Sequence, residues 1–418
     1  MSNTRNKLTV SLRAANEAAA VLAALPLQKR QAVLRTLASN LKQEKKRILA
    51  ENEKDVRAAS MGGRNDAFIN RLTLTDAAFD SMLKQVQTIS NSRDVLGTIL
   101  EKRIIAGGVR LEKVSVPLGV IGIIYESRPN VTIDVAALCI MSGNAAVLKG
   151  GSDALNTNRI LSKCVQKALK QNGLPAGAVV FLDTNDRRVV GQLVRENEYI
   201  DVLIPRGGYG LVKKVVSQSK IPVLYHASGG ARIFIDKEAD LKMAVKVCEN
   251  AKTNRPATCN SVDTILVHEK VAAAFIPAVV EALQKKGVEV RGDAKTAKLA
   301  RVKKAKESDY ATEFLDYIVV IKVVKDVDEA IGFIRTYTKK HTEGIISRNK
   351  GVVEKFVSTI DAAGIFVNCS TRLHDGGVFG LGAEMGVATG KLHARGPVGL
   401  RELTTYKWVA YGSGQLRK

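Results

Sequence analysis

One cysteine of this chain stands among residues whose types suit nucleophilic chemistry. Cys259 lies in the run Lys-Thr-Asn-Arg-Pro-Ala-Thr-Cys-Asn of residues 252–260, behind a proline and near two cations, Lys252 and Arg255. Nearby positive charge favours the thiolate, which is the nucleophilic form of cysteine. The pattern predicts a helix before this run and a strand after it, so the thiol falls in a turn, where site residues tend to collect. The alternative is a small buried residue, as most cysteines are.

The other cysteines and the histidines carry weaker signals. Cys139, Cys164 and Cys248 fall on apolar faces of expected helices and are interpreted as core residues, whereas Cys369 follows an expected strand and is the only rival nucleophile. The chain has an odd number of cysteines and no C-x-x-C pair, so a reducing compartment is expected and a disulfide framework is not. The histidines show no metal-ligand spacing, so no metal is expected. His226, at a strand end, is the best functional candidate among them.

Two glycine-rich segments follow expected strands and suit phosphate binding, because backbone N–H groups at a helix start bind phosphate and glycine permits a close approach. Their candidate residues are Lys149, Gly150, Gly151 and Ser152 in the first, and Arg206, Gly207 and Gly208 in the second. Neither matches G-x-G-x-x-G, so each alone could be a plain turn. Together, at the ends of strands of one sheet, they predict a dinucleotide site. Lys149 and Ser152 suit a ribose 2′-phosphate and favour NADP, whereas Asp153 argues for NAD.

Strands and helices must alternate to place these residues. The apolar run 118–125 predicts a buried parallel strand, and the alternation that follows predicts a doubly wound, Rossmann-like α/β domain with a second α/β domain after it. A hairpin over 99–117, with one polar face, is expected to pair with a partner chain or to form an edge of the same chain. The expected division is residues 1–98 and 118–230 for the cofactor, 231–397 for catalysis, and 99–117 and 398–418 for oligomerisation strands.

Composition limits the class of protein. With 418 residues, 45% hydrophobic and 25% charged, the chain is an ordinary globular protein of two or three domains. Its net charge of +23 fits either nucleic acid or anionic small molecules. Because the cations are spread and aromatics make up only 5%, no nucleic-acid partner is expected. No apolar run reaches the length of a membrane span, so a cytoplasmic protein without a membrane partner is expected.

Four long blocks carry a resemblance to a known family. They are residues 116–130, 252–260, 375–384 and 394–408, which include Tyr-Glu-Ser-Arg-Pro-Asn at 125–130 and Ala-Arg-Gly-Pro-Val-Gly at 394–399. Over nearly its whole length the chain resembles the γ-glutamyl phosphate reductases of the aldehyde dehydrogenase superfamily. The resemblance implies NADPH-dependent reduction of L-glutamyl 5-phosphate to L-glutamate 5-semialdehyde in proline biosynthesis, with phosphate released from a thioacyl intermediate on Cys259.

The resemblance also implies roles for single residues. It places Ser127 or Asn130 where the superfamily has an oxyanion-hole asparagine, and Lys149 near the adenosine ribose. It places Arg206 to Gly208 near the phosphates of NADP(H), and Glu313 at the nicotinamide ribose. It implies a homo-oligomer built through the hairpin and the C-terminal strand. Functional coupling to glutamate 5-kinase is expected with it.

Substrate contacts follow from the chemistry of a phosphorylated amino acid. Arginine binds carboxylate and phosphate, so Arg128, Arg255 and Arg395 are candidate clamps, and Glu384 is a candidate for the amino group. His226 is the remaining candidate for a substrate contact.

The chain departs from its superfamily at two places. Residues 227–230, Ala-Ser-Gly-Gly, lack the general-base glutamate of hydrolytic members, which fits a reaction in which no water is activated. Ser228, Ala231 and Arg232 also differ from the pattern of such reductases, which affects the substrate contacts expected around His226. Two other functions remain: an acylating dehydrogenase that uses coenzyme A or another acyl phosphate, and a module in which the basic surface binds nucleic acid.

Overall fold

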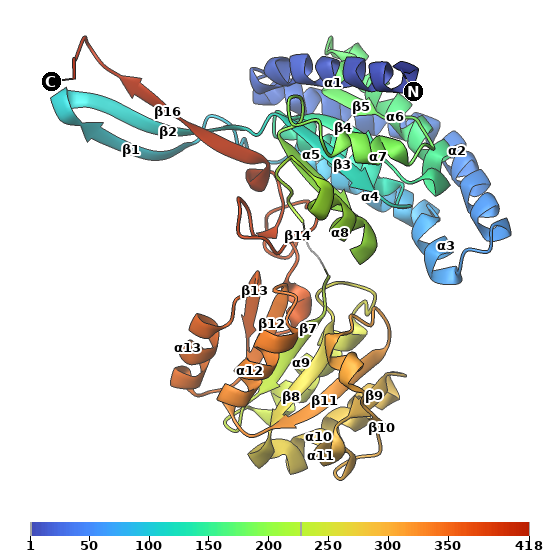
Figure 1. The fold of residues 1–418 in the computed structure, drawn as a ribbon, viewed down its shortest axis with the longest axis vertical. Coiled ribbons are helices and arrows are strands. Elements are labelled where there is room, and N and C mark those ends of the chain that lie inside the picture. Colours follow the sequence, from blue (N-terminus) through green and yellow to red (C-terminus); the bar gives the residue numbers. More distant parts are fainter. Residues whose placement is uncertain (1, 226–227, 418) are drawn as a thin grey trace. The chain divides into compact units, whose positions relative to one another are not determined.

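The computed structural model describes residues 2–225 and 228–417 (Figure 1). Its contacts divide the chain into two compact units. Unit 1 comprises Met1–Tyr225, Gly380–Gly386 and Val398–Lys418, and unit 2 comprises His226–Phe379 and Val387–Pro397. Among the described residues no helix is both long and apolar enough to cross a membrane.

Unit 1 is built on a parallel sheet of four strands in the order β5-β4-β3-β6. These are β3 (Val120–Tyr125), β4 (Ala145–Lys149), β5 (Val179–Phe181) and β6 (Val202–Arg206). Every residue of β3 is buried, as expected for a strand covered on both faces by helices. Its helices are α1 (Ser2–Ala23), α2 (Leu27–Met61), α3 (Asp66–Leu72), α4 (Asp76–Ser90), α5 (Asn130–Met141), α6 (Leu155–Gln171), α7 (Arg188–Leu193) and α8 (Tyr209–Gln218).

Unit 1 also carries an antiparallel arm, which Figure 1 shows extending from its sheet. The arm has the order β1-β2-β16, with β1 (Ile99–Ile105), β2 (Val109–Pro117) and β16 (Thr404–Tyr411). Gly107 and Gly108, with φ of 77° and 76°, form the turn between β1 and β2, a conformation that favours glycine. Several apolar side chains of the arm are exposed, including Ile104 at 66% and Trp408 at 45%.

Unit 2 is a parallel sheet of seven strands in the order β10-β9-β11-β8-β7-β12-β13. The strands are β7 (Ala231–Ile235), β8 (Val262–His268), β9 (Glu289–Gly292), β10 (Lys303–Lys304), β11 (Ile318–Val324), β12 (Thr342–Ile346) and β13 (Gly364–Val367). The helices are α9 (Leu241–Thr253), α10 (Glu269–Lys285), α11 (Ala294–Ala297), α12 (Val327–Tyr337) and α13 (Lys350–Thr359). A two-stranded ribbon joins β14 (Val387–Ala388) to β15 (Gly396–Pro397).

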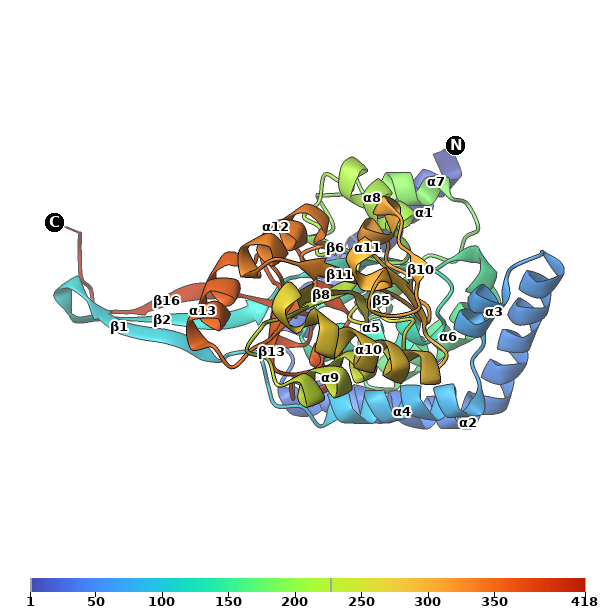
Figure 2. The same cartoon turned by 90° about the horizontal axis from the view of Figure 1, so that it is seen from below.

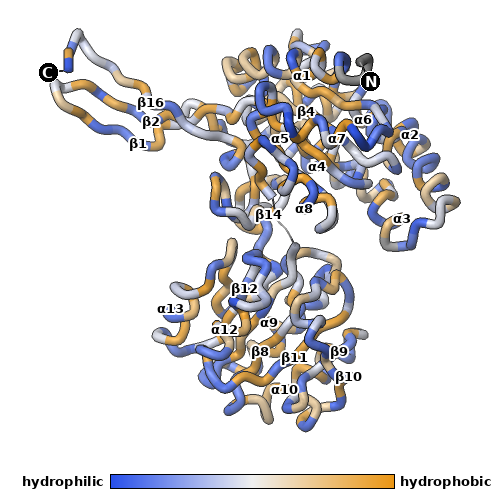
Figure 3. Tube along the Cα trace, viewed as in Figure 1, coloured by the Kyte–Doolittle hydropathy of each residue, from blue (hydrophilic) through white to orange (hydrophobic). Residues whose placement is uncertain are grey.

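Helices cover both faces of the sheet of unit 2. Helices α9 and α10 cover one face, and helices α12 and α13 cover the other (Figure 2). The interior strand β11 is hydrophobic along most of its length, as a doubly covered parallel strand requires (Figure 3). The predicted α/β class with doubly wound parallel sheets is therefore confirmed.

A buried ion pair joins two adjacent strands of unit 2. Arg232 of β7 and Glu343 of β12 are register partners, 3.4 Å apart, and their side chains are 3% and 0% exposed. Arg232 also donates to the carbonyl oxygens of Gly230 and Tyr337. Burial raises the pKa of Glu343 to about 7, although Arg232 acts in the opposite direction. Arg232, which departs from the family pattern, is therefore a core residue of unit 2.

Replacing Glu343 with glutamine should remove a pH dependence of stability. In the unfolded chain Glu343 loses its proton near pH 4.5, but in the fold it keeps the proton to about pH 7. Its contribution to the free energy of unfolding is therefore lost as pH rises through this window, by on the order of 3 kcal/mol. Urea unfolding across the window should show Glu343→Gln gaining stability relative to the unmodified protein as pH rises. Parallel profiles would contradict this, and the exposed Glu354→Gln is the control.

Candidate active site

The candidate nucleophile lies in a loop of unit 2 between α9 and β8. Cys259 is partly exposed, unlike Cys139, Cys164 and Cys248, which are buried. Arg255 adopts a left-handed φ of 61°, which turns the chain directly after α9. The Thr258 hydroxyl donates to the Arg255 carbonyl at 2.8 Å, so a local hydrogen bond closes the turn that precedes the thiol.

Two glycines fix the backbone at the thiol. The N–H of Gly230 donates to the carbonyl of Cys259 at 2.8 Å. A Cβ at Gly229 would overlap the carbonyl oxygen, Cα and Cβ of Cys259. Gly230 itself has φ of 96°, which other residues rarely adopt. This stretch therefore requires glycine in order to pass so close to the candidate nucleophile.

Glu313 lies beside the same stretch. Its Oε2 accepts a hydrogen bond of 2.9 Å from the hydroxyl of Ser228, which directly precedes Gly229. Unit 2 therefore brings both Cys259 and Glu313, predicted from positions 54 residues apart in sequence, into contact with residues 228–230. Asp263 lies next to the same stretch, because a Cβ at Gly230 would lie 2.7 Å from its Oδ2.

Lys252, one of the two cations near Cys259 in sequence, forms an ion pair with Asp263. The Nζ–Oδ1 distance is 3.1 Å and both side chains are buried. Burial lowers the pKa of Lys252, and burial raises the pKa of Asp263 to about 6, in each case against the attraction of the partner. The positive charge of Lys252 is thus compensated by Asp263.

Arg372 is a cation at this loop that the sequence analysis missed. It lies in the short helical turn η5 (Thr371–Leu373), and its Nε donates to the Asn254 carbonyl at 2.6 Å. Burial lowers the pKa of Arg372, while negative charge at Cys259 and at Asp375 opposes that lowering. Sequence proximity did not indicate this contact, because Arg372 lies 113 residues beyond Cys259, three residues before the block 375–384 that resembles the family.

Arg395, another predicted residue of unit 2, is bound to a carboxylate outside the Cys259 loop. The Nη1 of Arg395 donates to Asp361 at 2.7 Å. Asp361 is also 3.3 Å from Lys340 and from Lys391, and these cations, Arg395 first, lower its pKa to about 2. Arg395 is therefore bound to a carboxylate of its own chain.

In unit 1 the predicted residues gather at the carboxyl edge of the sheet, because β3, β4 and β6 are adjacent. Ser127 follows β3 and is buried, and a Cβ at Gly151, after β4, would lie 3.4 Å from its Oγ. Asn130 begins α5 and donates to Asp134 at 2.8 Å. Burial raises the pKa of Asp134 to about 7, with Asn130 and the charge of Arg206 opposing it.

Lys149 and its neighbours form a polar corner after β4. The buried Lys149 Nζ donates to the Gly150 carbonyl at 2.7 Å, and burial lowers its pKa. A Cβ at Gly150 would overlap the side-chain nitrogen of Asn158. That nitrogen is buried and has no hydrogen-bond partner among the described residues. Ser152 opens the helical turn that precedes α6. The corner therefore combines a cation with an unused amide donor.

The second predicted phosphate position holds a carboxylate. Glu126 Oε2 accepts from the N–H of Gly208, at the N-terminus of α8, at 2.9 Å. A Cβ at Gly207 would lie 2.6 Å from Glu126 Cδ. Glu126 thus occupies the place expected for anionic phosphates next to Arg206, a contact that sequence spacing did not reveal.

Four substrate candidates remain, of which three lie in the described part of the chain. Arg128, after β3, is exposed, and Glu384 lies in the segment Gly380–Gly386 of unit 1. That segment reaches the sheet edge, because a Cβ at Gly386 would lie 3.0 Å from Arg206 Cζ. Arg255 is on the Cys259 loop. His226 lies outside the described residues.

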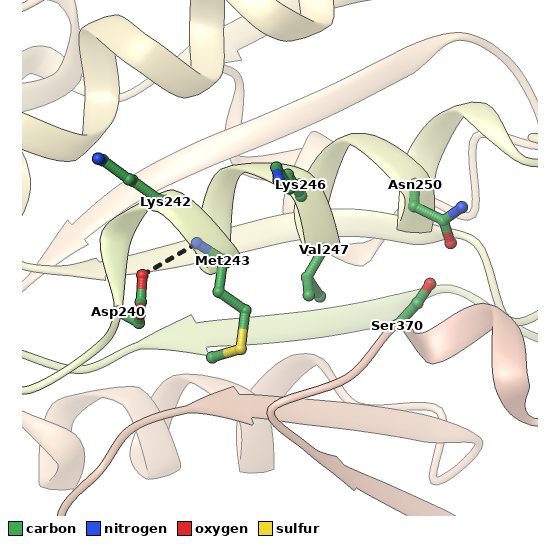
Figure 4. A pocket seen from close by; sticks show the side chains of 7 residues that line it. All are labelled: Asp240, Lys242, Met243, Lys246, Val247, Asn250 and Ser370. Atoms are coloured by element: carbon green, nitrogen blue, oxygen red, sulfur yellow. Dashed lines mark hydrogen bonds between the residues drawn. The ribbon is translucent and has the colours of Figure 1, made fainter.

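A groove of about 470 Å³ runs along the exposed face of α9 (Figure 4). Its lining residues are Asp240, Lys242, Met243, Lys246, Val247, Asn250 and Ser370. None of them belongs to the predicted site. Across residues 2–225 and 228–417, no group of three or more His, Cys, Asp or Glu side chains is arranged to hold a metal ion.

Comparisons with known proteins agree with this architecture. The model of the aldehyde dehydrogenase family matches residues 2–310. The γ-glutamyl phosphate reductase of Thermotoga sp. (strain RQ2) is 46% identical over 403 residues, which cover 96% of this chain and 97% of that protein. The crystal structure of γ-glutamyl phosphate reductase from Thermotoga maritima matches with a TM-score of 0.96 at 45% identity, covering 98% of this chain and 100% of that one.

A more distant structure shares the fold alone. The acetylating aldehyde dehydrogenase from Geobacillus thermoglucosidasius has a TM-score of 0.70 at 18% identity, covering 99% of this chain and 98% of that one. The resemblance expected from the sequence blocks is therefore confirmed. The chain belongs to the aldehyde dehydrogenase family and, within it, to the γ-glutamyl phosphate reductases.

Proposed function

We propose that this chain reduces L-glutamyl 5-phosphate to L-glutamate 5-semialdehyde with NADPH, as a step of proline biosynthesis. The observation that carries the proposal is the partly exposed thiol of Cys259 in a loop whose backbone Gly229 and Gly230 fix. The identity of 46% to a named γ-glutamyl phosphate reductase supports the choice of substrate. The cytoplasm is the proposed location.

The reaction begins with a thioacyl transfer. The Cys259 thiolate attacks the acyl carbon of glutamyl phosphate, a carbon–sulfur bond forms, and the carbon–oxygen bond to phosphate breaks with its electron pair leaving on phosphate. We assign stabilisation of the oxyanion to the Cys259 N–H and to Ser127 or Asn130. The side-chain amide of Asn130 already donates a hydrogen bond to Asp134, so we prefer Ser127 as the donor to the oxyanion.

Reduction completes the reaction. When bound, NADPH supplies the hydride that reduces the thioester carbon. The Cys259 sulfur then leaves as the thiolate when the hemithioacetal collapses to the semialdehyde. The sequence Ala-Ser-Gly-Gly of residues 227–230 contains no carboxylate to activate water, which supports acyl exchange with phosphate rather than hydrolysis.

The residues of the polar corner fit the adenosine end of the cofactor. Lys149, Gly150, Gly151 and Ser152 would hold the ribose, because the corner offers a buried cation and the unused donor of Asn158. Arg206, Gly207 and Gly208 would meet the phosphates. On unit 2, Glu313 would hold the nicotinamide ribose.

The substrate carries a carboxylate, an amino group and a phosphate. Arg255, four residues before Cys259, is our first choice for its anionic groups, followed by Arg128. Arg395 would first have to leave Asp361. Glu384 and His226 stay candidates for the remaining polar contacts.

The arm favours assembly with a second copy of the chain. Its edge strand β1 exposes Ile99, Leu100, Ile104 and Ile105, an arrangement that isolated proteins avoid on a sheet edge. We therefore propose a homo-oligomer. Coupling to glutamate 5-kinase, which would supply the acyl phosphate, is proposed with it.

Replacing Cys259 with serine should abolish the reaction. Serine cannot present the ionised sulfur, so activity should fall by at least about a thousandfold. The measurement is NADP reduction with glutamate semialdehyde and phosphate, with Cys369→Ser as the control that keeps activity. Full activity of Cys259→Ser would remove the mechanism. Activity with coenzyme A but not phosphate as acyl acceptor would replace the proposed substrate with an acyl-coenzyme A.

Replacing Glu126 with glutamine should tighten cofactor binding. The change removes a negative charge from the N-terminus of α8 while keeping an oxygen that can accept from Gly208. NADPH should therefore bind about threefold to tenfold more tightly. Calorimetric titration measures this, and Glu198→Gln, an exposed change of equal charge, is the control. Unchanged or weaker binding by Glu126→Gln would place the phosphates elsewhere.

Placing a charge on the edge strand should reduce the oligomeric state. Ile104 is 66% exposed, so glutamate in its place should fold normally but be disfavoured in an apolar contact between copies. Light scattering of the eluting protein should show a smaller assembly for Ile104→Glu than for Lys102→Glu. The second variant is the control, because Lys102 is an exposed polar residue two positions earlier on the same strand. The same mass for both variants would count against the arm as the interface.

A further inference from the structure

A cation near Cys259 would favour its thiolate, but Lys252, one of the two cations close to it in sequence, already pairs with Asp263. Lys252, seven residues before Cys259, is fully buried against Asp263 at 3.1 Å. Its charge compensates a carboxylate beneath the loop. Lys252 is therefore poorly placed to stabilise a thiolate in addition, since a buried pair broken at one partner leaves an uncompensated charge.

A second segment of unit 2 lies along the loop and is hydrogen-bonded to both of its ends. The Nε of Arg372 donates to the carbonyl of Asn254, the residue at the end of α9, at 2.6 Å. At the other end the side-chain amide of Asn260 donates to the carbonyl of His374 at 3.0 Å. The residues between these two bonds include Cys259.

The segment that carries Arg372 is itself fixed. Ser370 caps the turn η5 by accepting from the N–H of Arg372, and the N–H of His374 bonds back to the carbonyl of Thr371. Arg372 is partly buried. A guanidinium held through Nε keeps a defined orientation, because its donors share one plane.

The charges of Arg372 and Cys259 act on each other. Negative charge at Cys259 opposes the lowering of the Arg372 pKa that burial causes, and such an interaction is reciprocal. The guanidinium therefore favours the ionised form of the sulfur. Arg255 on the loop acts on Arg372 in the opposite sense to Cys259.

We propose that Arg372 is the positioning residue that clamps the Cys259 loop at Asn254 and holds the sulfur as a thiolate. The inference rests on the proposed function in one respect, which is that Cys259 is the nucleophile. It adds the residue that prepares the sulfur before any acyl phosphate arrives.

Other titratable groups surround the loop and enter the experiment. They are Arg255 on the loop, Lys252 and Asp263 beneath it, Glu313 beside Ser228, and His374 and Asp375 after η5. Burial lowers the pKa of His374 to about 4, so it stays neutral where thiols ionise. These groups are the same in every variant compared, so a difference between two profiles originates in the change at position 372.

The experiment follows alkylation of single thiols by iodoacetamide as a function of pH, with mass spectrometry resolving Cys259 from Cys369. Arg372→Gln should move the midpoint of the Cys259 profile upward by about one pH unit, which slows its alkylation near neutral pH about tenfold. Arg372→Lys keeps the charge and should retain at least half of the original rate advantage. Cys369, whose pKa burial raises, serves as the reference thiol and should not change.

Three results would overturn the proposal. The Cys259 midpoint of Arg372→Gln could match that of the unmodified protein. Arg372→Gln and Arg372→Lys could raise it equally, in which case the charge is not the cause. Cys259 and Cys369 could shift together, which would indicate general loosening of the unit. Should Arg372→Gln fail to fold, a Cys259 midpoint in Arg372→Lys that rises by the full unit would overturn it as well, and a partial rise would support it.

Alkylation requires neither NADPH nor glutamyl phosphate. A protein without reductase activity whose Cys259 profile still depends on Arg372 would sink the proposed function and leave this inference standing. A fully active reductase with an unmoved profile would do the reverse.

Discussion

The hydrogen bond from the N–H of Gly230 to the carbonyl of Cys259, 2.8 Å long, is the constraint around which unit 2 is organised. It holds two stretches of backbone so close that a side chain at position 229 would overlap Cys259. Such an approach is possible only for glycine, and it fixes the direction of the thiol without using a side chain. The strands β7 and β8, which begin beyond these residues, then run side by side and carry the geometry into the sheet.

Two buried ion pairs lie in the elements next to this contact. Lys252 with Asp263 and Arg232 with Glu343 are ion pairs with almost no exposed surface, and both connect elements that border the loop or its glycines. Pairs of this kind add little net stability, because desolvation offsets their attraction, but breaking one partner is costly. Their effect is to penalise any displacement of the Cys259 loop, which suits a reaction that needs the sulfur at one position.

The fold was largely predictable because its signals are local. Six consecutive apolar residues identify β3, and the alternation of strand and helix identifies two doubly wound sheets. The turn that carries Cys259 could be placed from Pro256 and its flanking patterns. Contacts between residues far apart in the sequence could not be predicted in this way. Arg372 reaches Asn254 from 118 residues away, and Glu126 reaches Gly208 from 82 residues away, in both cases through bonds that no periodicity encodes.

Charge illustrates the same limit most clearly. From sequence, Lys252 and Arg255 were the cations nearest the thiol, and proximity along the chain was the only guide. In the fold, Lys252 pairs with Asp263, and a cation that sequence proximity did not indicate, Arg372, comes to the loop from the segment after β13. The loop that carries the candidate nucleophile and the turn that carries Arg372 are joined by hydrogen bonds at Asn254 and at Asn260. A substitution in either segment is therefore transmitted to the other, so the direction of the thiol and the charge near it change together.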